Sequence, residues 1–157
     1  MLSNIKNDLT IDPLNVNYAL DINQTQLATF AHISGGEMEI TPIKHNVVYL
    51  SGELKTLMIP GATHFAPIVL EKGYGNTKEL YNWFIKANNG KVFDARQNVS
   101  IVLNAFTKDG FKPVVGWYLT NAWPTKVSGF EGDQATSPNL AKFSITLVCE
   151  GIERYDP

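Results

Sequence analysis

The stretch Phe143-Ser144-Ile145-Thr146-Leu147-Val148-Cys149-Glu150 decides the fold class. Its apolar side chains recur at every second position, and successive side chains of a strand point to opposite faces of a sheet, so the stretch is predicted to be a strand with one buried face. The same period of two appears in three other stretches: Tyr18, Leu20 and Ile22; Met38 and Ile40; and Val99, Ile101, Leu103 and Ala105.

Further strands are predicted near residues 27–34, 47–58, 65–72 and 112–123. Gly35-Gly36 and Asp109-Gly110 supply residues that reach positive φ, so hairpins are expected to close at both places. The stretch from Pro113 to Ala122 is apolar on both faces, which predicts that both faces are covered. A small domain with one helix covers only part of one sheet face, so another subunit is expected over the rest.

One segment has the spacing of a helix instead of a strand. Leu80, Trp83, Phe84 and Ala87 recur at i, i+3, i+4 and i+7, which predicts an amphipathic helix over residues 77–89. Asn76 is expected as its N-cap, with Glu79 in a capping-box position, and Gly90 as its left-handed C-terminal residue. The predicted fold is therefore mainly β, an antiparallel sandwich or partial barrel with one amphipathic helix packed on it.

Length and composition indicate one globular domain with a covered surface. The chain has 157 residues, a common size for a single domain. Charged residues make up 18%, below the usual share of about 25%. We divide the chain into a polar N-terminal arm, residues 1–16, and one domain, residues 17–157. The arm has no pattern that would join a core, and we expect it to help join subunits or rings.

Several classes of function are disfavoured by charge and by segment type. The formal net charge is −2 and no run of Lys or Arg is present, which disfavours capture of a nucleic-acid backbone. The apolar stretches are too short to predict a membrane-spanning segment. The first residues carry Lys6, Asp8 and Asp12 and no apolar stretch, so we expect no signal peptide and synthesis in a bacterial cytoplasm.

The residues that carry chemistry do not converge. His32, His45 and His64 lie in three separate segments without metal-ligand spacing, and Cys149 is the single cysteine on the apolar face of its strand. Gly73-Tyr74-Gly75-Asn76 lacks the full dinucleotide fingerprint, because Lys78 stands where its third glycine would be. We therefore predict no catalytic activity, no cofactor and no metal.

A set of short stretches in a fixed order resembles a known family. Pro60-Gly61, residues 68–73, the helix that carries Leu80 to Phe84, Asn121-Ala122-Trp123-Pro124 and the last strand ending in Glu150-Gly151-Ile152 are similar to the tube proteins of contractile tails. This family forms the inner tube of myovirus-type phage tails and of related injection systems. The resemblance covers roughly residues 17–154.

The resemblance implies a structural subunit rather than an enzyme. Family members form hexameric rings in which every subunit contributes strands to a continuous β-barrel around a channel, and the rings stack into a tube. The implied partners are further copies of the chain, a sheath protein, the initiator and terminator proteins of the tube, and a DNA or protein cargo. The implied location is a phage tail or an injection particle.

The resemblance also assigns candidate interface residues. Residues 42–59 match a long hairpin that reaches a neighbouring ring or subunit, with the candidate contacts Lys44, His45, Val47, Val48, Tyr49, Leu50 and Glu53. The apolar part of this stretch either forms a stacking interface or belongs to the sheet of its own subunit. The polar side of the helix gives candidate contacts to the sheath: Lys78, Tyr81, Asn82 and Lys86. The expected core comprises Leu80, Trp83, Phe84, Trp123, Phe143, Ile145 and Leu147.

A second class of function stays open on the sequence alone. The aromatic residues Trp117, Tyr118 and Trp123 are compatible with a monomeric β-sandwich module that binds a ligand or a glycan. The sequence does not distinguish a phage tail from an injection system, or DNA from protein as cargo. It does not assign the residues of the channel either, because a shift of one residue exchanges the two faces of every strand.

Overall fold

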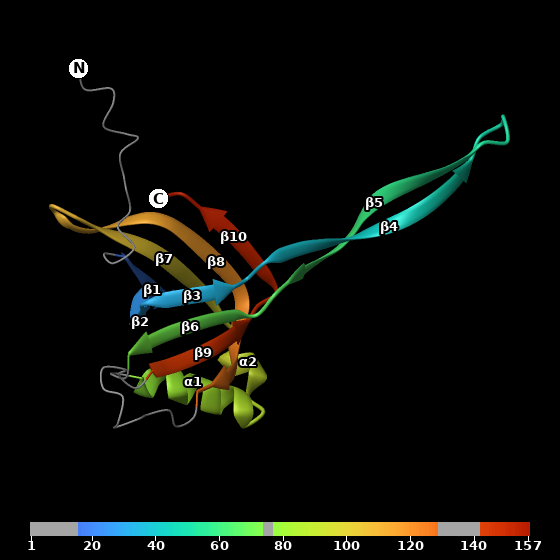
Figure 1. The fold of residues 1–157 in the computed structure, drawn as a ribbon. Coiled ribbons are helices and arrows are strands. Elements are labelled where there is room, and N and C mark those ends of the chain that lie inside the picture. Colours follow the sequence, from blue (N-terminus) through green and yellow to red (C-terminus); the bar gives the residue numbers. More distant parts are fainter. Residues whose placement is uncertain (1–15, 74–76, 129–141) are drawn as a thin grey trace, which may run out of the picture.

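The computed structural model describes residues 16–73, 77–128 and 142–157 (Figure 1). Residues 1–15, most of the predicted N-terminal arm, lie outside these ranges. In chain order, the elements are β1 (Val16–Ile22), β2 (Thr25–Phe30), β3 (His32–Gly35), β4 (Met38–Val48), β5 (Leu54–Phe65), β6 (Ile68–Gly73), α1 (Lys78–Asn88), α2 (Val92–Ala95), β7 (Gln97–Thr107), β8 (Gly110–Val127), β9 (Lys142–Val148) and β10 (Gly151–Tyr155).

The strands form two separate sheets. Seven strands of an eight-stranded sheet follow the order β2-β1-β7-β8-β9-β6-β3. The eighth strand, β10, pairs with residues 116–120 of β8, whereas β9 pairs with β8 after residue 122. The second sheet contains only β4 and β5, which form a long hairpin that projects from the body of the molecule (Figure 1). All pairings between described strands are antiparallel. The prediction of a mainly antiparallel β fold is confirmed.

The core lies inside the curved sheet and extends to the helices. Figure 1 shows α1 and α2 on one side of the sheet, where α1 packs against β8. Alternate residues of the strands bury the face that the sequence pattern indicated. The fully or nearly fully buried members include Leu20, Phe30, Leu70, Leu80, Val99, Ile101, Leu119, Phe143, Ile145 and Leu147.

Strand β8 bends at Asn121 and changes its neighbours there. Residues before the bend pair with β7 and β10, and Trp123 to Val127 pair with β9. Asn121 has φ 50°, which asparagine tolerates better than most residues. Its backbone N–H donates to Oδ1 of Asn98 at 3.1 Å, and its side-chain amide donates to Oε2 of Glu150 at 2.8 Å. These hydrogen bonds stabilise the bend, which allows β8 to pair with β7 and β10 on one side of the bend and with β9 on the other.

Three strand predictions are wrong in detail. Gly35 and Gly36 have positive φ but close no hairpin, because β3 pairs with β6 and β4 pairs with β5. They form the bend at which the chain leaves the body. The strand predicted over 47–58 crosses the actual hairpin turn between β4 and β5, and the strand predicted over 27–34 is divided at Ala31 into β2 and β3.

The helix prediction holds, and two short elements were missed. Gly90, at φ 79°, follows the C-cap Asn89 of helix α1; the N–H of Gly90 donates to the Ala87 carbonyl and that of Lys91 to the Lys86 carbonyl, as in a Schellman motif. Thr77 is the N-cap and makes no side-chain capping bond, while Asn76 lies outside the described residues. The sequence predicted one helix, but a second, four-residue helix, α2, follows α1. The short strand β10, which follows β9, was not predicted either.

Candidate assembly surfaces

The β4–β5 hairpin is the largest part of the described residues that has no core of its own. Its strands keep their pairing from Met38↔Phe65 to Val48↔Leu54, with one irregularity before Pro42. Nearly all of its side chains are exposed. Pro42 faces Pro60 across the hairpin and divides it into a part near the body and a distal half, residues 43–48 and 54–59. A two-stranded hairpin alone is at best marginally stable in water.

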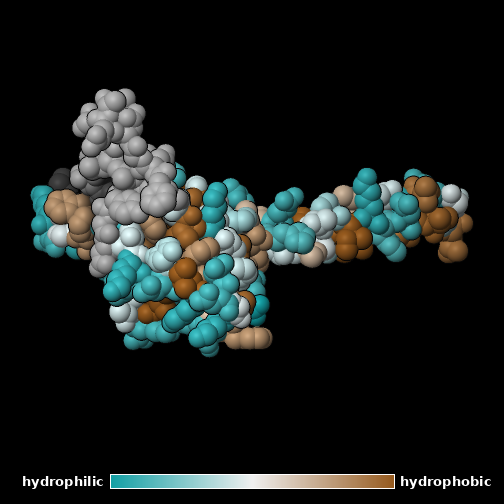
Figure 2. Space-filling view, turned by 90° about the horizontal axis from the view of Figure 1, so that it is seen from below, coloured by the Kyte–Doolittle hydropathy of each residue, from teal (hydrophilic) through white to brown (hydrophobic). Residues whose placement is uncertain are grey.

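The turn of the hairpin, residues 49–53, carries three of the predicted contact residues. The N–H of Tyr49 donates to the Glu53 carbonyl at 2.9 Å, and Gly52 provides the positive φ that the turn needs. The Lys55 ammonium lies 6.0 Å from the centre of the Tyr49 ring. Leu50 at the tip is completely exposed and contacts no core. Figure 2 shows hydrophobic residues gathered at this outer end of the hairpin.

The distal half of the hairpin has two different faces. Ile43 pairs with Ile59, and Leu57 follows two positions from Ile59; we call these three residues the aliphatic face. The opposite side carries Lys44, Asn46 and Thr56 together with the apolar residues Val48, Leu54 and Met58; there the Thr56 hydroxyl donates to Oδ1 of Asn46 at 3.0 Å. Of the other predicted contacts, His45 and Val47 lie on the side of the aliphatic face.

The hairpin exposes apolar residues that were predicted to be buried or were given no role in the sequence analysis. Met38 and Ile40 alternate as in a half-buried strand, yet they are 63% and 54% exposed. The expectation of a buried face at these residues is wrong for the isolated chain. Ile43, Leu54, Leu57, Met58 and Ile59 are also exposed and were not among the predicted contacts. Their signal in the sequence is the apolar character of both strand faces around the turn.

Helix α1 has a buried side and an outward side. Leu80 and Trp83 are buried, whereas Phe84 is only partly buried and does not belong to the central cluster. Trp123 packs against that cluster from a partly exposed position. The predicted sheath contacts all lie exposed on the outward side: Lys78, Tyr81, Asn82 and Lys86.

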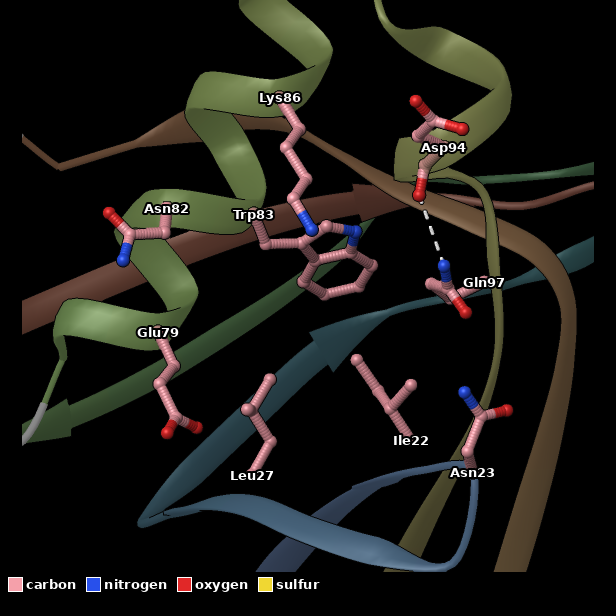
Figure 3. A pocket seen from close by; sticks show the side chains of 9 residues that line it. All are labelled: Ile22, Asn23, Leu27, Glu79, Asn82, Trp83, Lys86, Asp94 and Gln97. Atoms are coloured by element: carbon pink, nitrogen blue, oxygen red, sulfur yellow. Dashed lines mark hydrogen bonds between the residues drawn. The ribbon is translucent and has the colours of Figure 1, made fainter.

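A groove of about 350 Å³ runs between α1, α2 and the β1–β2 turn (Figure 3). Figure 3 shows Ile22, Leu27 and the Trp83 ring facing one another across it, with Glu79, Lys86 and Asp94 around its margin. The Trp83 indole N–H donates to the Ala95 carbonyl at 2.6 Å and so joins the two helices. This groove was not predicted from the sequence, because its walls come from segments far apart in the chain.

Two exposed aromatic sites were also missed. Phe93 on α2 is 89% exposed, and the Arg96 guanidinium lies 5.6 Å from the centre of its ring. Phe106 and Phe111 face each other edge to face at 5.3 Å near the β7–β8 turn, and both are more than half exposed. No helical or alternating pattern marks these residues as surface contacts.

The residues that carry chemistry stay apart in space as they do in the sequence. His32, His45 and His64 lie on β3, β4 and β5, all exposed. Within residues 16–73, 77–128 and 142–157, no group of three His, Cys, Asp or Glu side chains is arranged to hold a metal ion. Burial raises the pKa of the Cys149 thiol, which leaves less of the reactive thiolate. Neither helix of these ranges combines the length and apolar character needed to cross a membrane.

The model of one family, T4-like virus tail tube protein gp19, matches residues 14–153. This range includes both the curved sheet and the hairpin. The chain belongs to the T4-like virus tail tube protein family. It is a tail tube protein, and this membership does not favour the alternative of a glycan-binding module. No curated protein sequence matches the chain.

Solved structures show the same fold as this tail tube protein. One is a chain of the sheath–tube complex of the extracellular contractile injection system PVC, in its extended state. It is 19% identical, with a TM-score of 0.68 and coverage of 100% of this chain and 99% of that chain. A chain of the anti-feeding prophage tube-terminating cap is 21% identical, with a TM-score of 0.63 and coverage of 89% of this chain and 88% of that chain.

A third tail tube relative in fold comes from the PVC sheath/tube terminator in its extended state. It is 22% identical, with a TM-score of 0.62 and coverage of 88% of this chain and 92% of that chain. At these identities the likeness concerns the fold.

Proposed function

We propose that six copies of this tail tube protein close into a ring and that the rings stack into a hollow tube. A sheath surrounds the tube and drives it through a target envelope, and the channel conducts DNA or protein cargo. Family membership supports the tube, and two chains of similar fold come from PVC complexes that contain a sheath. The observation that carries the proposal is the β4–β5 hairpin, which exposes its apolar residues outside the core.

Exposure of these apolar side chains to water costs free energy. Burial of a large aliphatic side chain contributes about 1.5–3 kcal/mol, and the exposed hairpin carries several such side chains. A hairpin on one part of the chain that contacts a different surface of the next copy makes a head-to-tail interface, which closes into a ring when its rotation closes. Assembly therefore covers the hairpin that the isolated chain leaves open.

Sedimentation velocity and native mass spectrometry test the ring. The purified chain is measured over a range of concentrations, and we expect mass to shift from the monomer to the hexamer and its multiples. A hexamer without longer species would support the ring and place the stacking step under the control of a tube initiator. A dimer as the largest species at every concentration contradicts the proposal.

The outward side of α1 is the proposed contact with the sheath. Lys78 and Lys86 lie exposed on this side, next to Tyr81 and Asn82, and the groove of Figure 3 opens beside Asn82 and Lys86. A contact between charged surfaces steers association and fixes its register. We expect an acidic segment of the sheath protein at these lysines.

Charge reversal tests this contact. The double variant Lys78→Glu/Lys86→Glu is expected to form normal tubes but to lose sheath assembly when both proteins are produced together. The matched control Lys91→Glu/Lys108→Glu changes the charge equally at exposed sites outside the outward side of α1. Electron microscopy counts the sheathed tubes. Normal sheath assembly on the α1 variant would exclude this surface as the contact.

A further inference from the structure

The end of the β7–β8 hairpin carries two phenylalanines that the core does not cover. Phe106 and Phe111 are cross-strand partners, their ring centres lie 5.3 Å apart, and they are 58% and 55% exposed. This end lies on the opposite side of the molecule from the tip of the β4–β5 hairpin (Figure 1). The two rings form an apolar patch, and such a patch favours contact with a further segment that covers it.

Strand β1 stops short of this end of the sheet. Its first pair with β7 is Val16↔Ala105, whereas β7 and β8 stay paired for two more positions, as far as Thr107↔Gly110. Within the described residues, the edge of β7 at residues 106–107 therefore has no strand beside it. An unpaired edge presents backbone N–H and C=O groups with which a further extended segment can pair.

The N-terminal arm joins the described structure at this same place. The arm is attached to Val16, whose partner on β7 directly precedes Phe106. The beginning of β1 is held there, because the side-chain amide of Asn104 donates to Oδ1 of Asn17 at 3.2 Å. Neighbouring strands lie about 4.8 Å apart and an extended segment gains about 3.3 Å per residue, so residues 11–15 are long enough to cross β7 and reach both rings.

The sequence of the nearest part of the arm has one apolar side. Leu9 and Ile11 are two positions apart, so in an extended segment they share one side, and Thr10 and Asp12 share the other. Pro13 lacks an N–H, which ends any pairing along β7 and favours a change of direction there. A segment with one apolar and one polar side is suited to a place between an aromatic pair and water.

The short connection decides which copy supplies this segment. A short flexible linker gives an attached segment an effective concentration on the order of millimolar, roughly a thousand times that of a second copy at micromolar concentration. In the free chain, the arm of the same chain therefore reaches the aromatic pair long before the arm of another. The occupant that fits is the chain's own arm.

We propose that residues 9–15 fold back over Phe106 and Phe111 of their own chain and shield this aromatic pair from other copies. Leu9 and Ile11 supply the apolar cover, and the edge of β7 supplies backbone groups for the residues next to Val16. The contact lies within one free chain, so it goes beyond the tube proposed above and does not depend on it. The arm then limits association through the β7–β8 end.

Disulfide trapping in the full chain tests this contact. In a Cys149→Ser background, Thr10→Cys is combined with Lys108→Cys, which lies in the exposed turn two residues after Phe106. The matched control carries the same two cysteines together with Phe106→Ser/Phe111→Ser, so the linker is identical and the aromatic pair is absent. In dilute protein, we expect the disulfide within one chain to form at least about tenfold faster than in the control.

The products and rates decide between the copies. Equal rates in the two backgrounds overturn the proposal, because the aromatic pair then does not hold the arm. Covalent dimers as the main product would mean that the arm binds a second copy, which overturns it as well. Neither result bears on the ring, which sedimentation velocity tests independently. If the Phe106→Ser/Phe111→Ser background fails to fold, Leu9→Ser/Ile11→Ser replaces it as the control, with the same criterion.

Light scattering against protein concentration tests the shielding. Leu9→Ser/Ile11→Ser removes the apolar side of the segment, and the matched control Leu2→Ser/Ile5→Ser removes two aliphatic side chains outside residues 9–15. We expect the first variant to associate at a lower concentration than the natural chain, because its aromatic pair is uncovered, and the control to match the natural chain. A first variant that needs the same or a higher concentration contradicts the shielding.

Discussion

Trp83 connects the two helices through a single buried hydrogen bond. Its indole N–H donates to the Ala95 carbonyl at 2.6 Å, and its ring lies against the groove of Figure 3. Trp83→Phe keeps an aromatic ring but leaves this carbonyl without its donor, so we expect a loss of about 1–3 kcal/mol in the free energy of unfolding. Urea denaturation measures it. Tyr81→Phe, on the exposed side of the same helix, is the control, and equal stability of the two variants would contradict this role.

Asp21 on β1 gives a prediction about pH. Partial burial raises the pKa of its carboxyl above the ordinary value, because burial disfavours the charged form. At pH 7 the folded chain bears the cost of this charge, and the unfolded chain does not. Well below the ordinary carboxyl pKa the group is neutral in both states, and the cost disappears.

Asp21→Asn is therefore expected to raise Tm at pH 7 and to have little effect near pH 3. Differential scanning calorimetry at both pH values measures the two shifts. Asp94→Asn, at an exposed position, serves as the control and should change Tm less at pH 7. A destabilising effect of Asp21→Asn at pH 7 would show that the ionised carboxylate is favourable in the fold.

At the scale of elements, the β4–β5 hairpin separates assembly from folding. Leu57 and Ile59 belong to the aliphatic face and lie outside the core of their own chain. Leu57→Ser/Ile59→Ser should therefore leave the Tm of the monomer unchanged. It should raise the concentration needed for assembly at least about tenfold, since loss of about 1.4 kcal/mol already corresponds to that factor.

Met58→Ser is the matched control on the opposite side of the same strand, where the side chain is also about half exposed. Light scattering against protein concentration measures assembly of both variants. A lower Tm of the double variant would mean that the hairpin contributes to folding of the single chain. Unchanged assembly would remove the aliphatic face from the interface.

The sequence predicted the elements whose partners lie within the same chain. Phe143, Ile145 and Leu147 alternate because β9 covers the core with one face, and Leu80 and Trp83 recur at helical spacing because α1 does the same. Met38 and Ile40 show the same alternation on a strand that covers nothing in the monomer. The periodicity indicates which side chains become buried, but it does not indicate whether the same chain or another copy buries them.

The other features that were predicted wrongly or not at all are turns, a short helix and long-range contacts. Gly35-Gly36 has the composition of a hairpin turn, but the strands that follow it pair with other partners, so local chemistry alone gave the wrong connection. Helix α2 is too short for a periodic signal. The groove at Trp83 and a second cleft, lined by Ile33, Trp117 and Ile152, each combine segments that lie far apart in the sequence, and no local pattern predicts such a contact.

At the scale of the whole molecule, the chain consists of a compact body and a hairpin that only another surface can cover. The body has its own core, with Leu20, Leu70, Leu119 and Ile145 completely buried. The hairpin extends from it as a separate two-stranded sheet (Figure 1). A rigid body with one projecting, partly apolar arm is suited to repeated head-to-tail contact, and membership in the tail tube family agrees with that design.

Electron microscopy of negatively stained protein tests the central claim most directly. The purified chain is imaged over a series of concentrations, and the same chain is imaged after production together with the baseplate and sheath proteins of its system. We predict rings with a central hole and tubes built from them, with sixfold symmetry in end views. Uniform small particles under both conditions, without rings or tubes, would contradict the account.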